Sequence, residues 1–454
     1  MLLLPPLLAC GDAESFLVLD FDTQPTCAAA DATCINAGTS TLVVQGMRVI
    51  HKPVPGHPLV SFRLSFDAPR GSSSRQRWAE TLALSMYELG GPRRFINPSD
   101  WDTELVRLAG AVSTGNGLDY GSISATAPVF SWRELWDLVI QGIADYRNYP
   151  WELENRRGVF GRGFSSERDD PSAAASIDAW SRLFQGQGYN YQREYQETLA
   201  AISNDDIDDA WRTLSASDRW LVTVVGDVSA DDIAAALEEA RPALPQQGTS
   251  PRFAPDVVPV LPPSPHVRLL PYPDAPTWYV VGYFKGPSGS SPDLAPLELG
   301  LSVLDRRLFE EVRDVRGLAY TTGARLSFYR EGFGSVWLTS ESPREALSVA
   351  RRVLFDLKAT GPSEAELAAA RSSLVTGLLT SNDTPSGMAA TLADWELTAG
   401  AREALDDYLV AMDAATPAGV ASVLEAYLRD IEIAAAGGGS ELSEQDLESW
   451  FVAP

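Results

Sequence analysis

The sequence predicts an α+β protein built from two tandem similar domains, each a mainly antiparallel sheet packed with helices. Three observations support this fold class. The chain has 454 residues, of which 45% are hydrophobic and 21% charged, so it is globular and longer than one core usually organises. The order strand, helix, hairpin, helices and closing strand occurs twice. A stretch rich in Pro, Gln and Ser at 241–265 separates the two occurrences and is typical of a semi-rigid spacer.

The first occurrence begins after a leader. Apolar runs at 41–44 and 47–50 flank Gln45-Gly46 and predict a turn between short strands. Alternation predicts a strand at 59–66, and helical spacing from Trp78 predicts a helix to residue 90. We expect a short helix at 101–108 and a hairpin at 111–128. A helix is expected at 131–147, with a capping box at Ser131. Two further helices are expected, one from residue 150 and one at 171–185. A buried strand and a helix are expected at 220–225 and 230–240.

The second occurrence has the same outline. Strands are expected at 267–270 and 278–284, a long helix at 294–313, and an antiparallel pair at 319–328 and 334–339. Helices are expected at 343–357, 363–379, 385–398, 401–411 and 417–428, and a closing strand at 431–435. We therefore divide the chain into a lipoprotein-type signal and tether (1–38), an N-terminal domain (39–240), a linker (241–265) and a C-terminal domain (266–454).

The charge and the motifs exclude several function classes. A net charge of -25 argues against nucleic-acid binding, which needs a basic surface. No G-x-S-x-G elbow and no P-loop occur in the sequence, so neither a serine hydrolase of that type nor a P-loop nucleotide site is predicted.

The N-terminus predicts export. Residues 7–10, Leu-Leu-Ala-Cys, resemble a bacterial lipobox, although no Lys or Arg precedes the apolar run as a signal peptide requires. An ordinary apolar start is the alternative. We expect lipidation of Cys10, a lipid anchor in the bacterial cell envelope and a location facing the periplasm. An exported setting would permit a disulfide between Cys27 and Cys34, with two unpaired thiols as the alternative.

Several segments resemble one enzyme family. The run at 305–320, Asp-Arg-Arg-Leu-Phe-Glu-Glu-Val-Arg-Asp-Val-Arg-Gly-Leu-Ala-Tyr, is similar to the second-domain signature of the insulinase/pitrilysin zinc peptidases, or inverzincins. His57-Pro-Leu-Val and Val224-Val-Gly-Asp-Val resemble the first core strand and the end of the first domain. The resemblance covers residues from about 40 to 436. It implies a half-shell of two similar domains that faces a second half-shell around a peptide-sized chamber.

The zinc motif of that family is missing. Active members carry H-x-x-E-H on a first-domain helix, where two histidines four residues apart reach one zinc ion. The matching helix, 78–90, holds no histidine, and the two possible registers place Glu80 or Thr81 first. The later helix has Glu152 and Glu154 only near its start, with Gly161 and Arg162 near the expected ligand position. The three histidines of the chain, His51, His57 and His266, are scattered. We therefore predict no metal or other cofactor in this chain.

The second-domain motif is retained. In active family members an Arg and a Tyr seven residues apart hold the substrate backbone and polarise its carbonyl, and here the pair maps to Arg313 and Tyr320. Both side chains donate hydrogen bonds suited to a developing oxyanion. The alternative is a surface cation that ends a helix and a partly buried strand tyrosine.

Loss of the zinc ligands with retention of the Arg/Tyr pair predicts a non-catalytic subunit. Its partners would be a zinc-bearing homologous peptidase subunit, a peptide substrate and the membrane. One alternative is a non-enzymatic scaffold in an envelope complex, with Trp132, Trp136 or Trp151 at partner contacts. The other is a metalloendopeptidase with unusual ligands, for which Glu80, Glu88 and Glu152 are the candidate donors.

Overall fold

A computed structural model describes residues 32–67, 74–95, 97–184, 189, 195–215, 220–240, 266–439 and 441–451. Cys10, Cys27 and the predicted linker 241–265 lie outside the described residues. Cys34 belongs to a short 3-10 helix, η1 (Ala32–Ile35), within the segment predicted as a tether, and Ile35 is buried. Cys34 is disulfide-bonded, and its predicted pairing with Cys27 stays a prediction.

The first half of the chain forms a six-stranded sheet in the order β1-β2-β6-β3-β5-β4. Its strands are β1 (Ser40–Val44), β2 (Met47–Pro53), β3 (Leu59–Asp67), β4 (Ala111–Asn116), β5 (Tyr120–Pro128) and β6 (Trp220–Gly226). Gln45 and Gly46 take positive φ values of 50° and 82°, as a two-residue hairpin turn requires. All seven residues of β6 are buried, which fits its continuous apolar sequence.

Helices of the first half follow the strands in chain order. They are α1 (Ser74–Gly90), α2 (Pro98–Arg107), α3 (Trp132–Ala144), α4 (Glu152–Asp169), α5 (Pro171–Leu183), α6 (Tyr195–Ala201), α7 (Asn204–Leu214) and α8 (Ala230–Ala240). Helices α6 and α7 were not predicted from the sequence. The capping box predicted at Ser131 is wrong, because the Ser131 hydroxyl donates to Leu108 O at 2.8 Å and makes no cap hydrogen bond.

The second half repeats this arrangement. Its sheet has the order β7-β11-β8-β10-β9, with β7 (His266–Pro271), β8 (Trp278–Lys285), β9 (Thr321–Ser327), β10 (Phe333–Ser340) and β11 (Ile431–Gly437). Its helices are α9 (Leu294–Leu308), η5 (Phe309–Asp314), α10 (Pro343–Thr360), α11 (Glu364–Ser381), α12 (Pro385–Thr398), α13 (Ala404–Ala414), α14 (Pro417–Tyr427), α15 (Glu444–Glu448) and η6 (Ser449–Phe451). The predicted helix 294–313 therefore changes from α-helix to a π-helical turn at Phe309.

Strand order and direction confirm the predicted α+β class and the duplication. The order β2-β6-β3-β5-β4 in the first sheet corresponds position by position to β7-β11-β8-β10-β9 in the second. In each sheet one pair is parallel, β2 with β6 and β7 with β11, and the other pairs are antiparallel. The sheets are thus mixed but mainly antiparallel.

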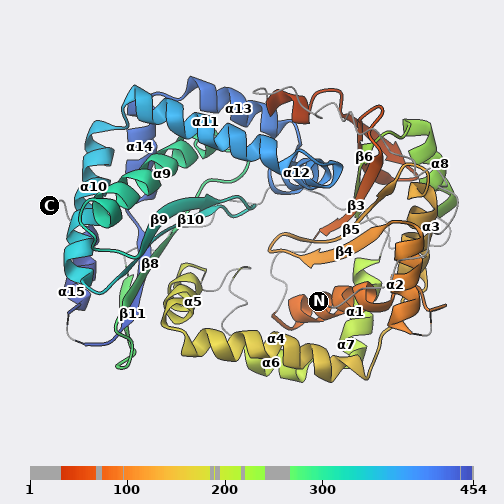
Figure 1. Cartoon of the computed structure of the whole chain (residues 1–454), viewed down its shortest axis with the longest axis horizontal. Helices are drawn as coiled ribbons and strands as arrows, with labels where there is room; N and C mark the ends of the chain where they lie inside the picture. Colours follow the sequence, from red (N-terminus) through yellow and green to blue (C-terminus); the bar gives the residue numbers. More distant parts are fainter. Residues whose placement is uncertain are drawn as a thin grey trace, which may run out of the picture.

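Each sheet is covered on one face by a helix from the other half (Figure 1). Helix α5 of the first half packs on β8 and β11, where Ala175 and Ala179 approach Ala434 and Ala436 closely. Helix α12 of the second half packs on β3 and β6, and its fully buried Leu392 joins a core with residues of β2 and β6. The two halves therefore share hydrophobic cores.

Charged groups reinforce this exchange of helices. Arg182 on α5 pairs with Glu432 of β11 and also donates to Ile433 O at 2.7 Å. Arg48 of β2 lies 2.5 Å from the buried carboxylate of Glu396 on α12. Truncating Arg182 or Arg48 would leave the buried carboxylate of Glu432 or Glu396 without its counter-charge, which is destabilising.

In the described part of the chain no single helix is both long and apolar enough to cross a membrane. The pair α13 and α14, bent by 116°, meets the length and composition criteria only when taken together.

Candidate functional site

Helix α1 carries the positions at which the family resemblance places zinc ligands. This helix packs beside the edge strand β4. The Asn116 amide donates to Thr81 Oγ1 at 2.8 Å and to Arg77 O at 3.1 Å. Leu84, one turn further on, is buried. The contact between α1 and β4 therefore holds hydroxyl, amide and apolar groups where a zinc site needs imidazole or carboxylate donors.

The acidic residues of α1 are held by other groups. Glu80 is buried and pairs with the Arg77 guanidinium at 2.8 Å. Glu88 accepts from the backbone N–H of Thr114 at 3.0 Å and from its hydroxyl at 2.5 Å. A buried guanidinium beside Glu80 would repel a divalent cation on the same helix. The residues present here therefore do not fit a zinc ion.

The later helix offers no replacement ligand set. On α4, Glu152 accepts from Asn155 at 2.9 Å and Glu154 pairs with Arg157. Within the described residues, no group of three His, Cys, Asp or Glu side chains is arranged to hold a metal ion. The two carboxylates at the start of α4 are thus held by local partners on their own helix.

The three histidines lie at separate places in the fold. His51, in β2, is buried, and its Nε2 lies 2.9 Å from Val228 O. Burial lowers the pKa of His51, which the backbone hydrogen bond opposes. The ring of His57 bonds to the backbone of Leu59 just before β3, and His266 begins β7.

Arg313 and Tyr320 lie on an ordered turn at the edge of the second sheet. Arg313 belongs to the π-helical segment η5, and its guanidinium lies 4.5 Å from the centre of the Phe309 ring. Gly317, with φ of 62°, donates to Arg313 O at 2.9 Å and closes the turn. Single π-helical turns often mark functional sites.

The strand that follows fixes the position of Tyr320. Its backbone N–H donates to Thr339 O at 2.8 Å, and its side chain is 79% exposed. Asp305 of α9 accepts from the N–H of Ala324 in β9 at 3.0 Å, and burial raises the pKa of that carboxyl. The turn is therefore anchored at both ends and presents Arg313 and Tyr320 to the outside.

Arg313 and Tyr320 share one turn, whereas α1 belongs to the other half of the chain. In Figure 1 the strand β9 lies in the second half and α1 in the first, on different sides of the molecule. If Arg313 and Tyr320 stabilise an oxyanion, the metal centre would therefore have to come from another chain.

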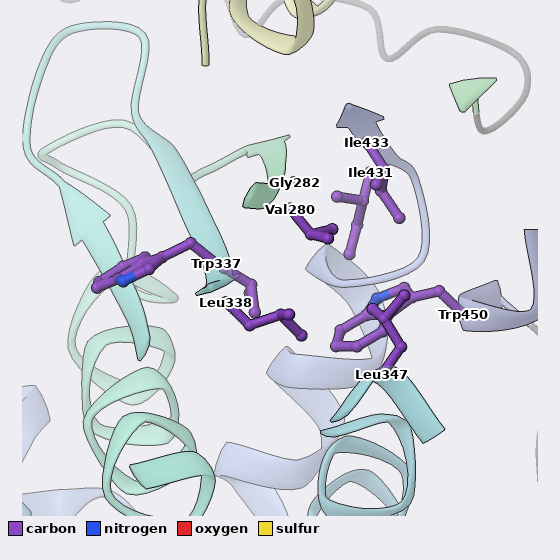
Figure 2. A pocket seen from close by; sticks show the side chains of 9 residues that line it. Val280, Gly282, Trp337, Leu338, Leu347, Ile431, Ile433 and Trp450 are labelled. Carbon is purple, nitrogen blue, oxygen red and sulfur yellow. The ribbon is translucent and has the colours of Figure 1, made fainter. Parts of the chain in front are cut away.

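Two cavities differ in chemistry. The first, shown in Figure 2, has a volume of about 20 Å³ and lies among apolar side chains, including Leu338, Ile431 and Trp450. It has room for about one water molecule, so it is a packing gap. A polar cavity of about 340 Å³ lies between the halves and is lined by Arg63 and Asp394. Neither residue was predicted from the sequence as part of a site. A charge at Arg63 inside an apolar strand was the only sequence signal.

Comparison with known proteins supports the family resemblance. Residues 201–374 match the family model described as the peptidase M16 inactive domain. No curated protein matches the sequence.

Solved structures share the fold at low sequence identity. The peptidase M16 inactive domain from Pseudomonas fluorescens is 18% identical, with a TM-score of 0.79, over 89% of this chain and 99% of that one. The periplasmic protease PqqL from Escherichia coli is 14% identical, with a TM-score of 0.73, over 88% of this chain and 45% of that one. A chain of complex III2 from Candida albicans is 14% identical, with a TM-score of 0.70, over 91% of this chain and 100% of that one.

This chain spans about half the length of the PqqL chain, at 45% coverage. The match over residues 201–374, the fold shared with M16-type structures and the absence of H-x-x-E-H from the sequence together support an insulinase/pitrilysin-type (M16) peptidase homologue that lacks the zinc site.

Proposed function

We propose that this chain is a non-catalytic subunit of a two-chain peptidase. A zinc-bearing homologous subunit supplies the metal, and this chain supplies Arg313, Tyr320 and half of the chamber wall. The observation that carries the proposal is the contrast between the two halves. The wall of α1 holds no zinc ligands and places Arg77 beside Glu80, whereas the turn with Arg313 and Tyr320 is anchored and exposed.

The chemistry of the pair suits peptide hydrolysis by a partner. A guanidinium and a phenol hydroxyl both donate hydrogen bonds, which stabilise the negative charge of a developing oxyanion. Removing one such donor typically lowers kcat by about 10²–10³-fold. Stacking on Phe309 restricts the Arg313 guanidinium, so less conformational entropy is lost when a substrate binds.

The decisive experiment reconstitutes the complex. The chain is co-purified with a zinc-bearing homologue from the same genome, and hydrolysis of a peptide is measured with Arg313→Ala and Tyr320→Phe variants of this chain. Arg316→Ala is the matched control, since it removes the same charge from the same turn but pairs with Glu311. We expect the first two variants to lose turnover and the control to keep it.

Two results contradict the proposal. The first is failure of any zinc-bearing homologue to associate with this chain. The second is unchanged turnover of the complex with Arg313→Ala. Because Tyr320 is 79% exposed, its truncation leaves the free energy of unfolding within about 0.5 kcal/mol, so a loss of turnover there reports on function.

A second candidate function is a scaffold without catalysis. The similarity to a chain of complex III2 from Candida albicans favours it, because it places the same fold inside a multisubunit assembly. Trp151, 60% exposed, is then available for a partner contact, whereas Trp136 is buried against Phe62 in the core. Purification of an intact complex that contains this chain and no peptidase subunit supports the scaffold and excludes the two-chain peptidase.

We also propose an envelope location through a lipid on Cys10. The lipobox-like sequence and the periplasmic name of the similar PqqL protein support it. Fractionation of cells that express wild-type protein and Cys10→Ser tests it. Membrane association is expected only for the wild type, and equal membrane association of both proteins contradicts the anchor.

A further inference from the structure

The polar cavity between the two halves has charged walls from both of them. Strand β3 and the β4–β5 turn contribute from the first half, and the β9–β10 turn and α12 contribute from the second. Its principal lining residues are Arg63, Asp119, Tyr120, Phe328, Tyr329 and Asp394. The volume of about 340 Å³ falls in the range of small-molecule pockets, roughly 300–1,000 Å³.

Arg63 is a cation with unused hydrogen-bonding capacity. Its Nη1 donates to Ser124 Oγ at 3.2 Å, and its guanidinium lies 5.6 Å from the centre of the Tyr120 ring. Its Nε is buried and has no acceptor among the described residues. The Nε is enclosed in the wall, but the guanidinium lines the cavity, and a carboxylate there would gain charge-assisted hydrogen bonds from its N–H groups.

Asp394 supplies an opposite charge from the other half. It lies on α12 one residue before Trp395, which packs against Phe328 at 4.6 Å between ring centres. Burial raises the pKa of Asp394 to about 6, Arg63 acts to lower it, and Asp119 acts to raise it. Among the described residues these are the two charged groups that act on the pKa of Asp394, and Tyr120 and Tyr329 also line the cavity. At pH 7 the carboxylate is mainly ionised.

The two charges line one cavity without pairing. In the part of the chain that the structure describes, no ion pair joins Arg63 to Asp394. The fold therefore holds a guanidinium and a carboxylate apart, with aromatic walls beside them. A simple anion would be repelled by Asp394 and Asp119, and a simple cation would leave the Arg63 guanidinium without an acceptor.

We propose that this cavity binds a zwitterionic α-amino acid, free or as a dipeptide, with its carboxylate on Arg63 and its ammonium on Asp394. Tyr120 and Phe328 contact its side chain. Opposite charges on one small ligand satisfy both walls at once. The inference needs no partner subunit, and it stands or falls independently of the proposed peptidase role.

Calorimetric titration of the full chain alone tests the proposal. The probes are L-leucine, L-leucyl-L-leucine, N-acetyl-L-leucine, which lacks the ammonium, and L-leucinamide, which lacks the carboxylate. We expect leucine or dileucine to bind, and each blocked analogue to bind about tenfold to hundredfold more weakly, as for loss of one hydrogen bond to a charged group. The tighter of leucine and dileucine identifies the source of the ligand.

Variants assign each charge to its wall. Asp394→Asn is expected to weaken the binding of leucine about tenfold or more and to leave the binding of N-acetyl-leucine unchanged. Arg63→Gln is likewise expected to weaken the binding of leucine and to leave that of leucinamide unchanged. Arg325→Gln is the control, because Arg325 is exposed and lines a different polar cavity. Binding of leucine, but not of N-acetyl-leucine, should weaken as the pH falls below about 6, the pKa of Asp394.

Several outcomes overturn the proposal. One is the absence of binding by both leucine and dileucine. Another is wild-type affinity for both blocked analogues, a result that needs no variant and so does not depend on variant folding. A third is unchanged leucine affinity in folded Asp394→Asn and Arg63→Gln proteins, with folding checked by circular dichroism.

Discussion

Replacing Leu392 with alanine tests whether α12 belongs to the core of the first half. Leu392 is fully buried, with 0% exposure, and shares a core cluster with Ile50, Leu221 and Val225. Truncating a fully buried leucine costs about 2.7–5.0 kcal/mol, because the lost transfer free energy and the cavity that remains both count. The substitution should destabilise the first sheet, although residue 392 lies in the second half of the sequence.

Hydrogen exchange of the β6 amides measures the effect. Strand β6 is central and fully buried, so its amides exchange only through opening of the core. A loss of about 2.7–5.0 kcal/mol corresponds to a roughly hundredfold to several-thousandfold faster exchange, at tenfold for each 1.4 kcal/mol. Exchange of β6 at the wild-type rate in Leu392→Ala, alongside faster exchange in β8 and β11, would refute the shared core.

A matched variant separates direct packing from shared cooperativity. Leu304 on α9 is also 0% exposed, but its core cluster contains only residues of the second half. Leu304→Ala should accelerate exchange in β8 and β11 by a comparable factor. If β6 also accelerates in Leu304→Ala, the two halves open as one unit. If it does not, the effect of Leu392→Ala on β6 reports direct contact.

Two further predictions concern single side chains. The Arg307 guanidinium, bonded at 2.7 and 2.8 Å, lowers the pKa of Glu366 to about 2 despite partial burial. In the unfolded chain the pKa of a glutamate is about 4.3, so the ionised Glu366 stabilises the folded protein above that pH, and this stabilisation is lost as the pH falls toward 2. In urea titrations at several pH values, the free energy of unfolding of Glu366→Gln should therefore fall less steeply with decreasing pH than that of the wild type. Gly282→Ala places a Cβ 2.7 Å from an Ile431 side-chain atom and should lower the free energy of unfolding by about 1–3 kcal/mol. Gly377→Ala, whose Cβ would have nothing within 4 Å, should stabilise α11 by about 0.5–1 kcal/mol. Chemical denaturation measures both changes, and a stabilised Gly282→Ala or a destabilised Gly377→Ala would contradict the respective prediction.

Local patterns in the sequence were enough to predict most elements. Strands β4 (Ala111–Asn116) and β5 (Tyr120–Pro128) together span the hairpin predicted at 111–128, and α12 (Pro385–Thr398) has its predicted bounds. These segments have strong punctuation, such as Thr384 and Pro385 at the start of α12, where the Thr384 side chain caps Gly387. Where capping depended on a distant partner, as at Ser131, sequence spacing predicted the wrong hydrogen bond.

The candidate site was predictable only in part. The absence of histidine from 78–90 and the motif at 305–320 are sequence facts, and they predicted the family and the missing zinc site. The π-helical turn was not predictable, because an α-helix and a π-turn have the same local residue preferences. The cavity with Arg63 and Asp394 was not predictable either, since these residues are far apart in the chain and come together through the packing of α12 on β3.

The sequence by itself determined the periodicities, the duplication and which side chains α1 carries at the positions of the family's zinc ligands, because these depend on residue type and short spacing. Only the tertiary structure decided which helix covers which sheet and which charges share a cavity. Helix α5 is rich in alanine and could have packed on either sheet by its local pattern. Its position was decided by long-range packing against Ala434 and Ala436 and by the pairing of Arg182 with Glu432.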